Sequence, residues 1–347
     1  MPQITLAGRR IGPDFPPLVI AEIGINHEGD FAKAEHMVRD AFAVGCECVK
    51  FQCHVVEDEM SPQAKSVIPG NADVSIYEIM ERCQLTEADE RRLKDLVESL
   101  GMIYLSTPFS RAAADRLEKM GVPGYKIGSG ECNNYPLVDH IASFGKPVIL
   151  STGMNSMANV AKSVEILRAR KVPFGLMHTT SMYPTPPEKV RLGAMQELMA
   201  AFPDAVVGLS DHTLTIYPCL GAAALGASML ERHYTSDKSW PGPDVSLSMD
   251  PEEMRSLIEG SRIIHKALGG SKGVLPEEQV TIDFAYASCV TIAAIKKGEP
   301  FTKGNLWVKR PGTGEILAEH FEGLIGRVAA RDIDVNTQLA WDMVHGQ

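Results

Sequence analysis

The sequence predicts an α/β fold, a (β/α)₈ TIM barrel followed by a small C-terminal domain. Short β-branched runs alternate with amphipathic segments of helical period, which is typical of βαβ units and a parallel sheet. Eight such units occur before about residue 270, and this number suits a closed barrel better than an open doubly wound sheet. Nearly every run also begins apolar and ends on a polar side chain, which indicates one shared polar mouth.

The eight expected strands follow one another at regular spacing. In chain order they cover residues 17–26, 47–52, 102–108, 124–131, 147–154, 174–180, 206–212 and 228–235. Barrel active sites are built from the C-terminal ends of the strands and the loops that follow them. One polar strand end would be a simple exit to the surface, but eight of them pointing the same way predict an active site.

Composition limits the class of function. The chain has 347 residues and a formal net charge of −10, which disfavours nucleic-acid binding because that function needs a basic face. Its 7 cysteines are scattered without repeated C-x-x-C spacing, so neither structural zinc nor a disulfide framework is indicated. The sequence shows no signal peptide and no membrane-spanning run, and we expect a cytoplasmic protein without membrane contact.

The pattern changes toward the C-terminus. We expect the barrel domain over residues 1–275, a linker over 276–287 and a compact module over 288–347. The module contains a weak two-copy repeat, residues 295–306 and 333–344, which predicts paired turns and hairpins. Taken alone, this module specifies no reaction and could be a structural or dimerising appendage.

Several residues at the strand ends could bind an anion. Lys50 and Lys126 lie on the second and fourth strands, where covering helices make simple solvent exposure a weak explanation. Hydroxyl groups lie at other strand ends, at Ser106, Thr107, Ser129, Ser151, Thr152 and Ser210. The glycines of "GSGE" and "STGM" let backbone amides approach a ligand. Each element is weak alone, but the ring of them predicts an anion pocket.

Two histidines are candidates for metal binding. His212 ends the seventh strand and His233 lies in the eighth, with Asp211 and Glu231 close by. Imidazoles on neighbouring strand ends can share a divalent ion whose other positions stay open. A single strand histidine is more often hydrogen-bonded in a core. We give that structural interpretation to His54 and His178, and we place His27 with Glu28 among the supporting loop residues.

Three carboxylates lie on or just beyond strand ends, at Glu22, Glu131 and Asp244, and they could bind hydroxyls or transfer protons. Two proline-rich segments border the expected mouth. They are "SMYPTPPE", with Tyr183 as a possible sugar contact, and "WPGPD". In isolation, both segments would be interpreted as stiff surface loops.

The ordered motifs resemble those of the bacterial sialic acid (N-acetylneuraminate) synthase family. They are "IAEIGINHEGD", "VKFQ", "IPGNADVSIYEIMERC", "LSTPFS", "YKIGSGECNNYPL", "ILSTGMNS", "YPTP", "GLSDHT", "LERHYT" and "NLWVKRPGTGE". The resemblance covers nearly the whole chain. It includes the C-terminal module, which is similar to the antifreeze-like (SAF, β-clip) domain.

The resemblance implies a reaction. The family condenses phosphoenolpyruvate with the open-chain aldehyde of an N-acetylmannosamine-type sugar and releases phosphate by C–O cleavage. A divalent ion, Mn²⁺ first and Mg²⁺ or Co²⁺ as alternatives, would polarise the aldehyde. A domain-swapped homodimer is also implied, in which Arg310 of a partner subunit contacts the N-acetyl region.

The resemblance also implies residue roles. His212 and His233 would ligate the ion, and Glu22 or Glu131 would handle protons. Phosphoenolpyruvate would be held by Lys50, Gln52, Thr107, Lys126, Ser129, Ser151, Ser181 and Ser210. The sugar would be recognised by Glu22, Asn71, Glu131, Tyr183, Asp244 and Arg310.

The sugar substrate stays open between two candidates. Ser181 occupies a position where synthases that use N-acetylmannosamine often carry Asn, and "SDKSW" is less acidic and less arginine-rich than expected for them. A legionaminic acid synthase, acting on a 2,4-diacetamido-2,4,6-trideoxymannose, shares most of the motifs. Two other classes are a Schiff-base aldolase that uses Lys50 or Lys126, and a carbohydrate- or ice-binding protein based on the C-terminal module alone.

Overall fold

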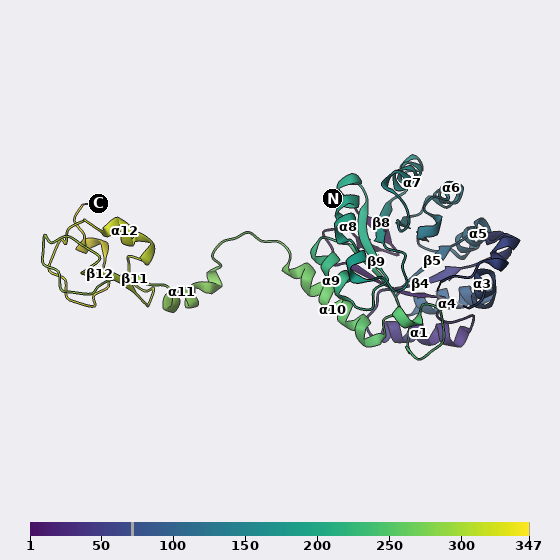
Figure 1. Cartoon of the computed structure of the whole chain (residues 1–347), viewed down its shortest axis with the longest axis horizontal. Helices are drawn as coiled ribbons and strands as arrows, with labels where there is room; N and C mark the ends of the chain where they lie inside the picture. Colours follow the sequence, from purple (N-terminus) through teal and green to yellow (C-terminus); the bar gives the residue numbers. More distant parts are fainter. Residues whose placement is uncertain (71–72, 347) are drawn as a thin grey trace. The chain divides into compact units, whose positions relative to one another are not determined.

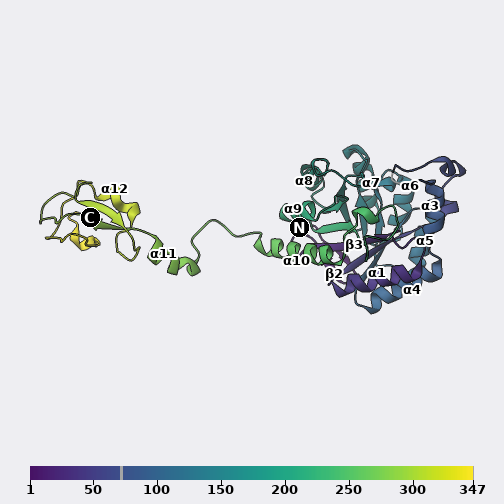
Figure 2. The ribbon, with the colours of Figure 1, turned by 60° about the horizontal axis from the view of Figure 1, so that its bottom comes forward.

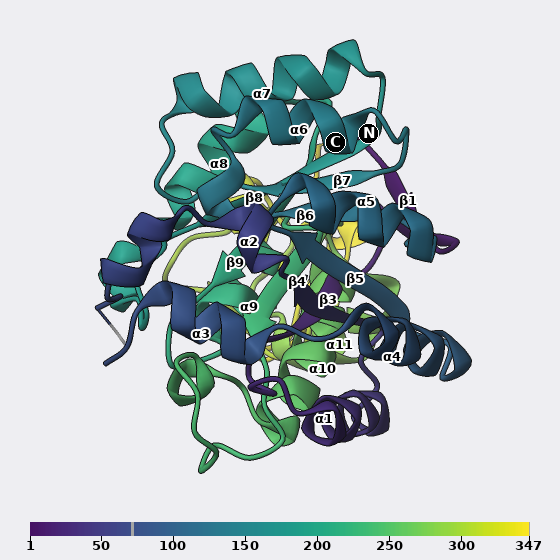
Figure 3. The same cartoon turned by 90° about the vertical axis from the view of Figure 1, so that its right-hand side faces the viewer.

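Eight parallel strands form a nearly closed barrel and confirm the expected fold. A computed structural model describes residues 1–70 and 73–346 of the chain, and these counts refer to them. The strands are β3 Leu18–Gly24, β4 Cys48–Cys53, β5 Ile103–Pro108, β6 Tyr125–Ile127, β7 Val148–Ser151, β8 Phe174–Thr179, β9 Val206–Asp211 and β10 Met229–His233. Their order is β5-β4-β3-β10-β9-β8-β7-β6, and the end strands β5 and β6 lie against each other (Figure 3).

A helix follows each barrel strand and packs outside the sheet (Figure 1). These helices are α1 Phe31–Ala43, α4 Glu87–Ser99, α5 Arg111–Met120, α6 Tyr135–Ala142, α7 Met157–Ala169, α8 Leu192–Ala201, α9 Tyr217–Ala224 and α10 Pro251–Ala267. The connection after β4 holds two more, α2 Val56–Glu59 and α3 Ile76–Cys83. Figure 2 shows α1 and α4 side by side along the barrel.

Local sequence signals fix where many of these helices begin. The side chain of the residue before the helix accepts a hydrogen bond from a backbone N–H of its first turn, at Asp30, Ser75, Thr86, Ser110, Asn134, Ser156 and Asp250. Such N-caps satisfy backbone donors that have no partner within the helix. Because caps stand just after several strand ends, they help to fix the loops that border the site.

An N-terminal hairpin fills the end of the barrel opposite the polar mouth. Its strands, β1 Ile4–Leu6 and β2 Arg9–Ile11, pair antiparallel, and the sequence analysis assigned no element to them. Each has three residues, which is shorter than the run that period-two alternation can reveal. Ile4, Leu6 and Ile11 are buried in one cluster with inward side chains of the barrel strands.

Side chains alternate between the two faces of each barrel strand. The inward set near the strand starts is apolar and comprises Leu18, Ile20, Cys48, Ile103, Leu105, Ile149, Met177, Val206 and Met229. Two or four residues further along the same strands, the same face carries Glu22, Lys50, Thr107, Ser151, Ser210 and Glu231. Successive residues of a strand point to opposite faces, so the polar groups rest on an apolar floor.

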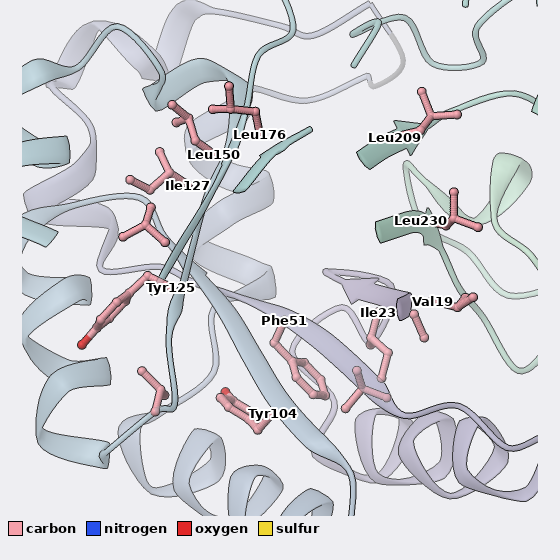
Figure 4. Close-up of a cluster of buried hydrophobic side chains, with 14 of the residues drawn as sticks. Val19, Ile23, Phe51, Tyr104, Tyr125, Ile127, Leu150, Leu176, Leu209 and Leu230 are labelled. Atoms are coloured by element: carbon pink, nitrogen blue, oxygen red, sulfur yellow. The ribbon is translucent and has the colours of Figure 1, made fainter. Parts of the chain in front are cut away.

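The outward set forms the larger core between strands and helices (Figure 4). Val19 and Ile23 of β3, Phe51 of β4 and Leu230 of β10 belong to it. The rings of Phe51 and Tyr104 stack with centroids 5.6 Å apart. This core anchors the strands whose opposite faces carry the polar groups.

The C-terminal part of the chain forms a separate compact unit, Gly270–Gln347, beside the barrel unit Met1–Gly269 in the division of the chain. It contains β11 Ser288–Thr291, β12 Leu306–Lys309 and α12 Phe321–Leu324 around a core of its own. Helix α11 Gln279–Ala285 occupies most of the expected linker. The two repeat copies pair directly, because Ile295 and Ile333 exchange backbone hydrogen bonds of 2.9 and 2.8 Å.

All 7 cysteines are unpaired and buried, in agreement with the interpretation that they are small apolar residues. In the part of the chain that the structure describes, no helix combines the length and the apolar character needed to cross a bilayer.

The hairpin leads to a stability prediction. Leu6 is fully buried, so Leu6→Ala removes methyl groups from the barrel floor and leaves a cavity. We expect it to lower the free energy of unfolding by about 2–5 kcal/mol, measured by urea denaturation. Thr5→Ala, on the exposed face of the same strand, is the control and should change it by less than about 0.5 kcal/mol. Equal losses for both would contradict the packing role of the hairpin.

Candidate active site

The polar strand ends enclose a cavity of about 270 Å³ inside the mouth of the barrel. It brings together twelve of the sequence-predicted site residues: Glu22, Lys50, Gln52, Thr107, Lys126, Ser129, Ser151, Ser181, Tyr183, Ser210, His212 and His233. All eight barrel strands, or the loops directly after them, contribute to the lining. The closure of the barrel therefore gathers residues that lie up to about 200 positions apart in the sequence.

Four buried charges stand at the base of this cavity. Lys50 Nζ lies 2.7 Å from Glu22 Oε2 and 3.6 Å from Glu231 Oε1. Lys126 Nζ lies 3.1 Å from the same Glu231 oxygen. Glu22 and Lys50 face each other because they are register partners on adjacent strands β3 and β4. Two cations and two anions thus compensate each other where none of them reaches solvent.

The cluster shifts the proton affinities of its members. Burial alone would lower the pKa of Lys50, but Glu22 and Glu231 outweigh it and raise that pKa. Burial lowers the pKa of Lys126, and Lys50 adds to this effect against the carboxylate of Glu231. For Glu231, burial would raise the pKa, but Lys126 and Lys50 hold it well below the usual range. Glu231 is therefore the anion that keeps both lysines charged.

Glu231 is a site residue to which the sequence analysis gave no role. It accepts a hydrogen bond from Ser210 Oγ at 3.3 Å as well as the two lysine contacts. The signal lay in strand alternation, because Met229, Glu231 and His233 must share the inward face of β10. A glutamate between an apolar floor residue and a candidate ligand necessarily lies inside the barrel.

Hydroxyl and amide groups cover the rest of the floor. Lys50 Nζ donates to Thr107 Oγ1 at 3.2 Å, and the buried Oγ of Ser151 has no hydrogen-bond partner. The backbone N–H of Gly153 donates to Ser129 Oγ at 3.1 Å. A side chain at Gly153 would begin 2.4 Å from Ser181 Oγ, so only glycine admits this close approach. Such groups suit a ligand with several anionic oxygens.

His212 and His233 lie on neighbouring strands with ring centroids 5.5 Å apart. His212 Nδ1 donates to the backbone carbonyl of Thr180 at 2.9 Å, which leaves Nε2 as the unprotonated nitrogen. Burial, with a smaller contribution from His233, lowers the pKa of His212 to about 3, so its ring is neutral. His233 Nδ1 is buried without a hydrogen-bond partner.

These two rings fit an ion whose remaining positions are open. A neutral imidazole oriented through its other nitrogen by a carbonyl is the usual state of a metal ligand. Within residues 1–70 and 73–346, no three His, Cys, Asp or Glu side chains gather as a complete ligand set. Water or substrate would therefore have to complete the coordination of any ion held here.

Two further predicted residues border the histidines. The ring of Tyr183 lies 4.2 Å from that of His212 and 6.0 Å from that of His233, measured between centroids. Asp244 Oδ2 lies 3.9 Å from His233 Nδ1 and comes from the loop after β10. Both proline-rich loops thus face the histidine side of the site.

Three predicted residues lie elsewhere. Glu131 follows β6 on a 3-10 turn, accepts a hydrogen bond from Asn134 and lines a neighbouring cavity of about 380 Å³ instead. Burial raises the pKa of this carboxyl. Arg310 follows β12 in the second unit, where it lines a cavity with Lys309 and Asn336. Asn71 falls outside the described residues.

The remaining candidate histidines are engaged in local structure. His27 is buried, and its Nδ1 accepts the backbone N–H of Gly29 at 3.0 Å. His178 Nε2 bonds the carbonyl of Val190 at 2.6 Å. Both contacts hold loops, as expected. His54 has different surroundings, because its ring contacts a residue of the cavity wall, Gln52.

Fold and site together define a barrel enzyme that binds an anionic substrate within its ring of strand ends. Residues 37–273 match the model of the NeuB family, and residues 286–345 match that of the SAF domain. The chain belongs to the NeuB family, and its resemblance to sialic acid synthases is confirmed.

Relatives of known name match over nearly the whole chain. The chain is 37% identical over 324 residues to the N,N'-diacetyllegionaminic acid synthase of Campylobacter jejuni, which covers 91% of this chain and 96% of that protein. It is 32% identical over 346 residues to the human N-acetylneuraminate-9-phosphate synthase, covering 98% and 96%. The N-acetylneuraminic acid synthetase of Leptospira borgpetersenii superposes with a TM-score of 0.74 at 30% identity, over 81% of this chain and 95% of that one.

The charge cluster leads to a second prediction. Glu231→Gln removes the anion between two buried lysines, so we expect the free energy of unfolding near neutral pH to fall by about 3 kcal/mol or more. Because the pKa of Glu231 is depressed in the folded state, its contribution is present above the ordinary glutamate pKa and is lost as pH falls toward the folded value. The variant should therefore lose less stability on acidification than the parent, as urea unfolding at several pH values would show.

Glu252→Gln is the matched control, since Glu252 lies exposed on α10. It should leave both the stability and its acid dependence nearly unchanged. If Glu231→Gln behaved like this control, the compensating role of Glu231 would be refuted.

Proposed function

We propose that this enzyme condenses phosphoenolpyruvate with an N-acetylmannosamine-type sugar and releases inorganic phosphate. The observation that carries the proposal is the joining of Lys50, Lys126 and the histidine pair within one cavity. An anion site and a site for an electrophile then lie side by side, as a reaction between an anionic nucleophile and a sugar aldehyde requires. The named relatives support this choice.

The lysine side of the cavity suits phosphoenolpyruvate. Its phosphate and carboxylate need several cationic or hydroxylic partners, and Lys50, Lys126 and Ser151 offer them from three strands. Ser151 supports this assignment most directly, because its buried hydroxyl lacks a partner in the protein. Thr107, Ser129, Ser181, Ser210 and the amide of Gln52 complete the proposed set.

A Schiff-base aldolase is a weaker alternative. That chemistry begins with a neutral lysine amine, usually obtained by lowering its pKa. The pKa of Lys50 is raised instead, by the carboxylates of Glu22 and Glu231 acting against burial. Lys126 remains ion-paired to Glu231 at 3.1 Å. Both lysines are thus arranged to stay cationic, as phosphate binding needs.

The histidine side suits a divalent ion, for which we propose Mn²⁺, with Mg²⁺ and Co²⁺ as alternatives. His212 and His233 would hold it, because one has a free, neutral ring nitrogen and the other has no hydrogen-bond partner at Nδ1. When bound, such an ion acts as a Lewis acid toward a carbonyl oxygen.

The remaining residues would orient the sugar and move protons. Glu22 Oε2 is paired with Lys50, and Gln52 holds Oε1, so the carboxylate is fixed where a sugar hydroxyl can donate to it. In the reaction, C3 of the enol forms a bond to the aldehyde carbon, and water adds at C2. The tetrahedral product then expels phosphate through C–O cleavage. Glu22 would receive or return the proton of a reacting hydroxyl.

Tyr183 and Asp244 border the same side and would contact the sugar. A domain-swapped homodimer, in which Arg310 of a second copy contacts the N-acetyl group, belongs to the same proposal. So does the cytoplasm as the place of action.

Two acceptor sugars are candidates. N-acetylmannosamine is the first, with sialic acid as product. The second is 2,4-diacetamido-2,4,6-trideoxymannose, which would give N,N'-diacetyllegionaminate. Ser181 on the cavity wall and the 37% identity to a legionaminic acid synthase favour this second candidate.

Phosphate release tests the reaction. With phosphoenolpyruvate and Mn²⁺ present, we expect release that depends on one of these two sugars, with a preference of about tenfold or more in kcat/KM for the true acceptor. The two sugars are compared side by side, with N-acetylglucosamine as the control that differs in configuration. No sugar-dependent release with either candidate would overturn the proposal, and trapping of a lysine adduct by borohydride would favour the aldolase.

The metal assignment has its own prediction. His233→Ala should lose Mn²⁺ binding and reduce turnover by about 100-fold or more, because one of two protein ligands is removed. Bound metal is measured by equilibrium dialysis alongside kcat. His36→Ala, which changes an exposed histidine of α1, should retain both. Metal binding and turnover that survive in His233→Ala would disprove the assignment.

A further inference from the structure

A chain of buried hydrogen bonds leads from the active-site carboxylate away from the cavity. Gln52 Nε2 donates to Glu22 Oε1 at 3.1 Å, and the other end of the amide, Oε1, lies 3.1 Å from His54 Nε2. The second ring nitrogen, His54 Nδ1, lies 2.7 Å from Glu59 Oε2 on α2. Four side chains thus connect the cavity wall to a helix that contributes nothing else to it.

The donors and acceptors of this chain can be assigned without ambiguity. Glu22 is ion-paired with Lys50, so its carboxylate only accepts, and Gln52 must turn its NH₂ group toward it. The carbonyl oxygen of the Gln52 amide then faces His54 Nε2, which must carry a proton to donate. Glu59 is also an acceptor, so His54 Nδ1 must carry a proton as well.

We propose that His54 is an imidazolium held by Glu59, and that this pair positions Gln52 and thereby Glu22 for the reaction. The inference rests on the proposed function for the role of Glu22, but the protonation of His54 follows from the hydrogen bonds alone. His54 and Glu59 are positioning residues, since neither lines the cavity. The sequence analysis gave His54 only a structural interpretation.

The surroundings of His54 suit a buried cation. Its ring is 2% exposed and stacks on Phe109 with centroids 4.7 Å apart and planes 12° apart. An aromatic face stabilises a cation above it. Phe109 also belongs to the cavity lining, so the stack fixes His54 against the wall it supports.

The other charged groups around His54 are few. Glu90 of α4 and its partner Arg116 of α5 form an ion pair of 3.3 Å nearby, and His27 lies across from it after β3. Glu131 stands beyond Glu59. Glu59 is the one carboxylate within hydrogen-bond distance of the ring among the described residues, and it therefore decides the charge.

Loss of the Glu59 charge has a specific consequence. With Gln at position 59, a neutral His54 can donate from only one nitrogen. If it donates to residue 59, the carbonyl of Gln52 faces a lone pair, and the amide is no longer fixed. Glu22 then keeps Lys50 but loses the defined orientation of its second oxygen. Substrate anions would still bind, because Lys50 and Lys126 are untouched.

The first test is ¹⁵N NMR of the full-length wild-type protein labelled at histidine, without substrate. We expect the His54 ring to show two protonated nitrogens in neutral buffer, with the signals assigned by their loss in His54→Phe. In Glu59→Gln, one of the two should become unprotonated. A neutral His54 ring in the wild-type protein would overturn the proposal, and this measurement depends neither on a variant that folds nor on any assigned reaction.

The second test is kinetic and uses Glu57→Gln as the matched control, because Glu57 is exposed on the same helix. With phosphoenolpyruvate, the preferred sugar and Mn²⁺, Glu59→Gln should lower kcat about tenfold and leave the KM for phosphoenolpyruvate within about twofold. His54→Phe, which preserves the stack but cannot donate, should give the same pattern.

Equal kcat values for Glu59→Gln and Glu57→Gln would refute the positioning role. A rise in the KM for phosphoenolpyruvate that matched the fall in kcat/KM would refute it too, because general disturbance of the cavity would then explain the loss. If wild-type protein had no synthase activity, the proposed function would fail while the NMR result on His54 still stood or fell alone.

Discussion

The site depends on the balance of four charges inside the barrel. Lys50 and Lys126 could not remain charged there without Glu22 and Glu231, since an unpaired buried ion costs several kcal/mol. The pairs in turn require the closed sheet, because their members come from β3, β4, β6 and β10. A ligand that binds beside them meets lysines already fixed in place. The protein thereby meets the cost of burying cations during folding, before any substrate arrives.

Much of this arrangement could be predicted from the sequence, because one rule determines both fold and site. Strand alternation puts Leu18, Ile20 and Glu22 on one face, and each of the other strands repeats an apolar start and a polar end. In a barrel that face can only point inward. Eight independent strand ends thus predicted one cavity, and twelve of the sixteen residues proposed for the site line it.

The remaining features depend on contacts that spacing does not encode. The hairpin of β1 and β2 is too short for a periodic signal, and only the empty barrel floor explains its burial. Glu131 ends an apolar run as Glu22 does, but the turn after β6 directs its carboxyl to Asn134. Glu231 was obscured by the histidine beside it in the motif. In each case the outcome was decided by which partner lies across space, and not by residue type.

His54 shows why hydrogen-bond direction adds information that residue lists lack. A buried histidine with two hydrogen bonds is satisfied in either charge state if its neighbours can both donate and accept. Here neither neighbour can adapt, because Lys50 fixes Glu22 as an acceptor and Glu22 fixes the amide of Gln52. The direction of each bond therefore passes outward from the charge cluster to His54 and ends at Glu59. Both oxygens of Glu22 are held from opposite sides, and the carboxylate faces the cavity in a single orientation.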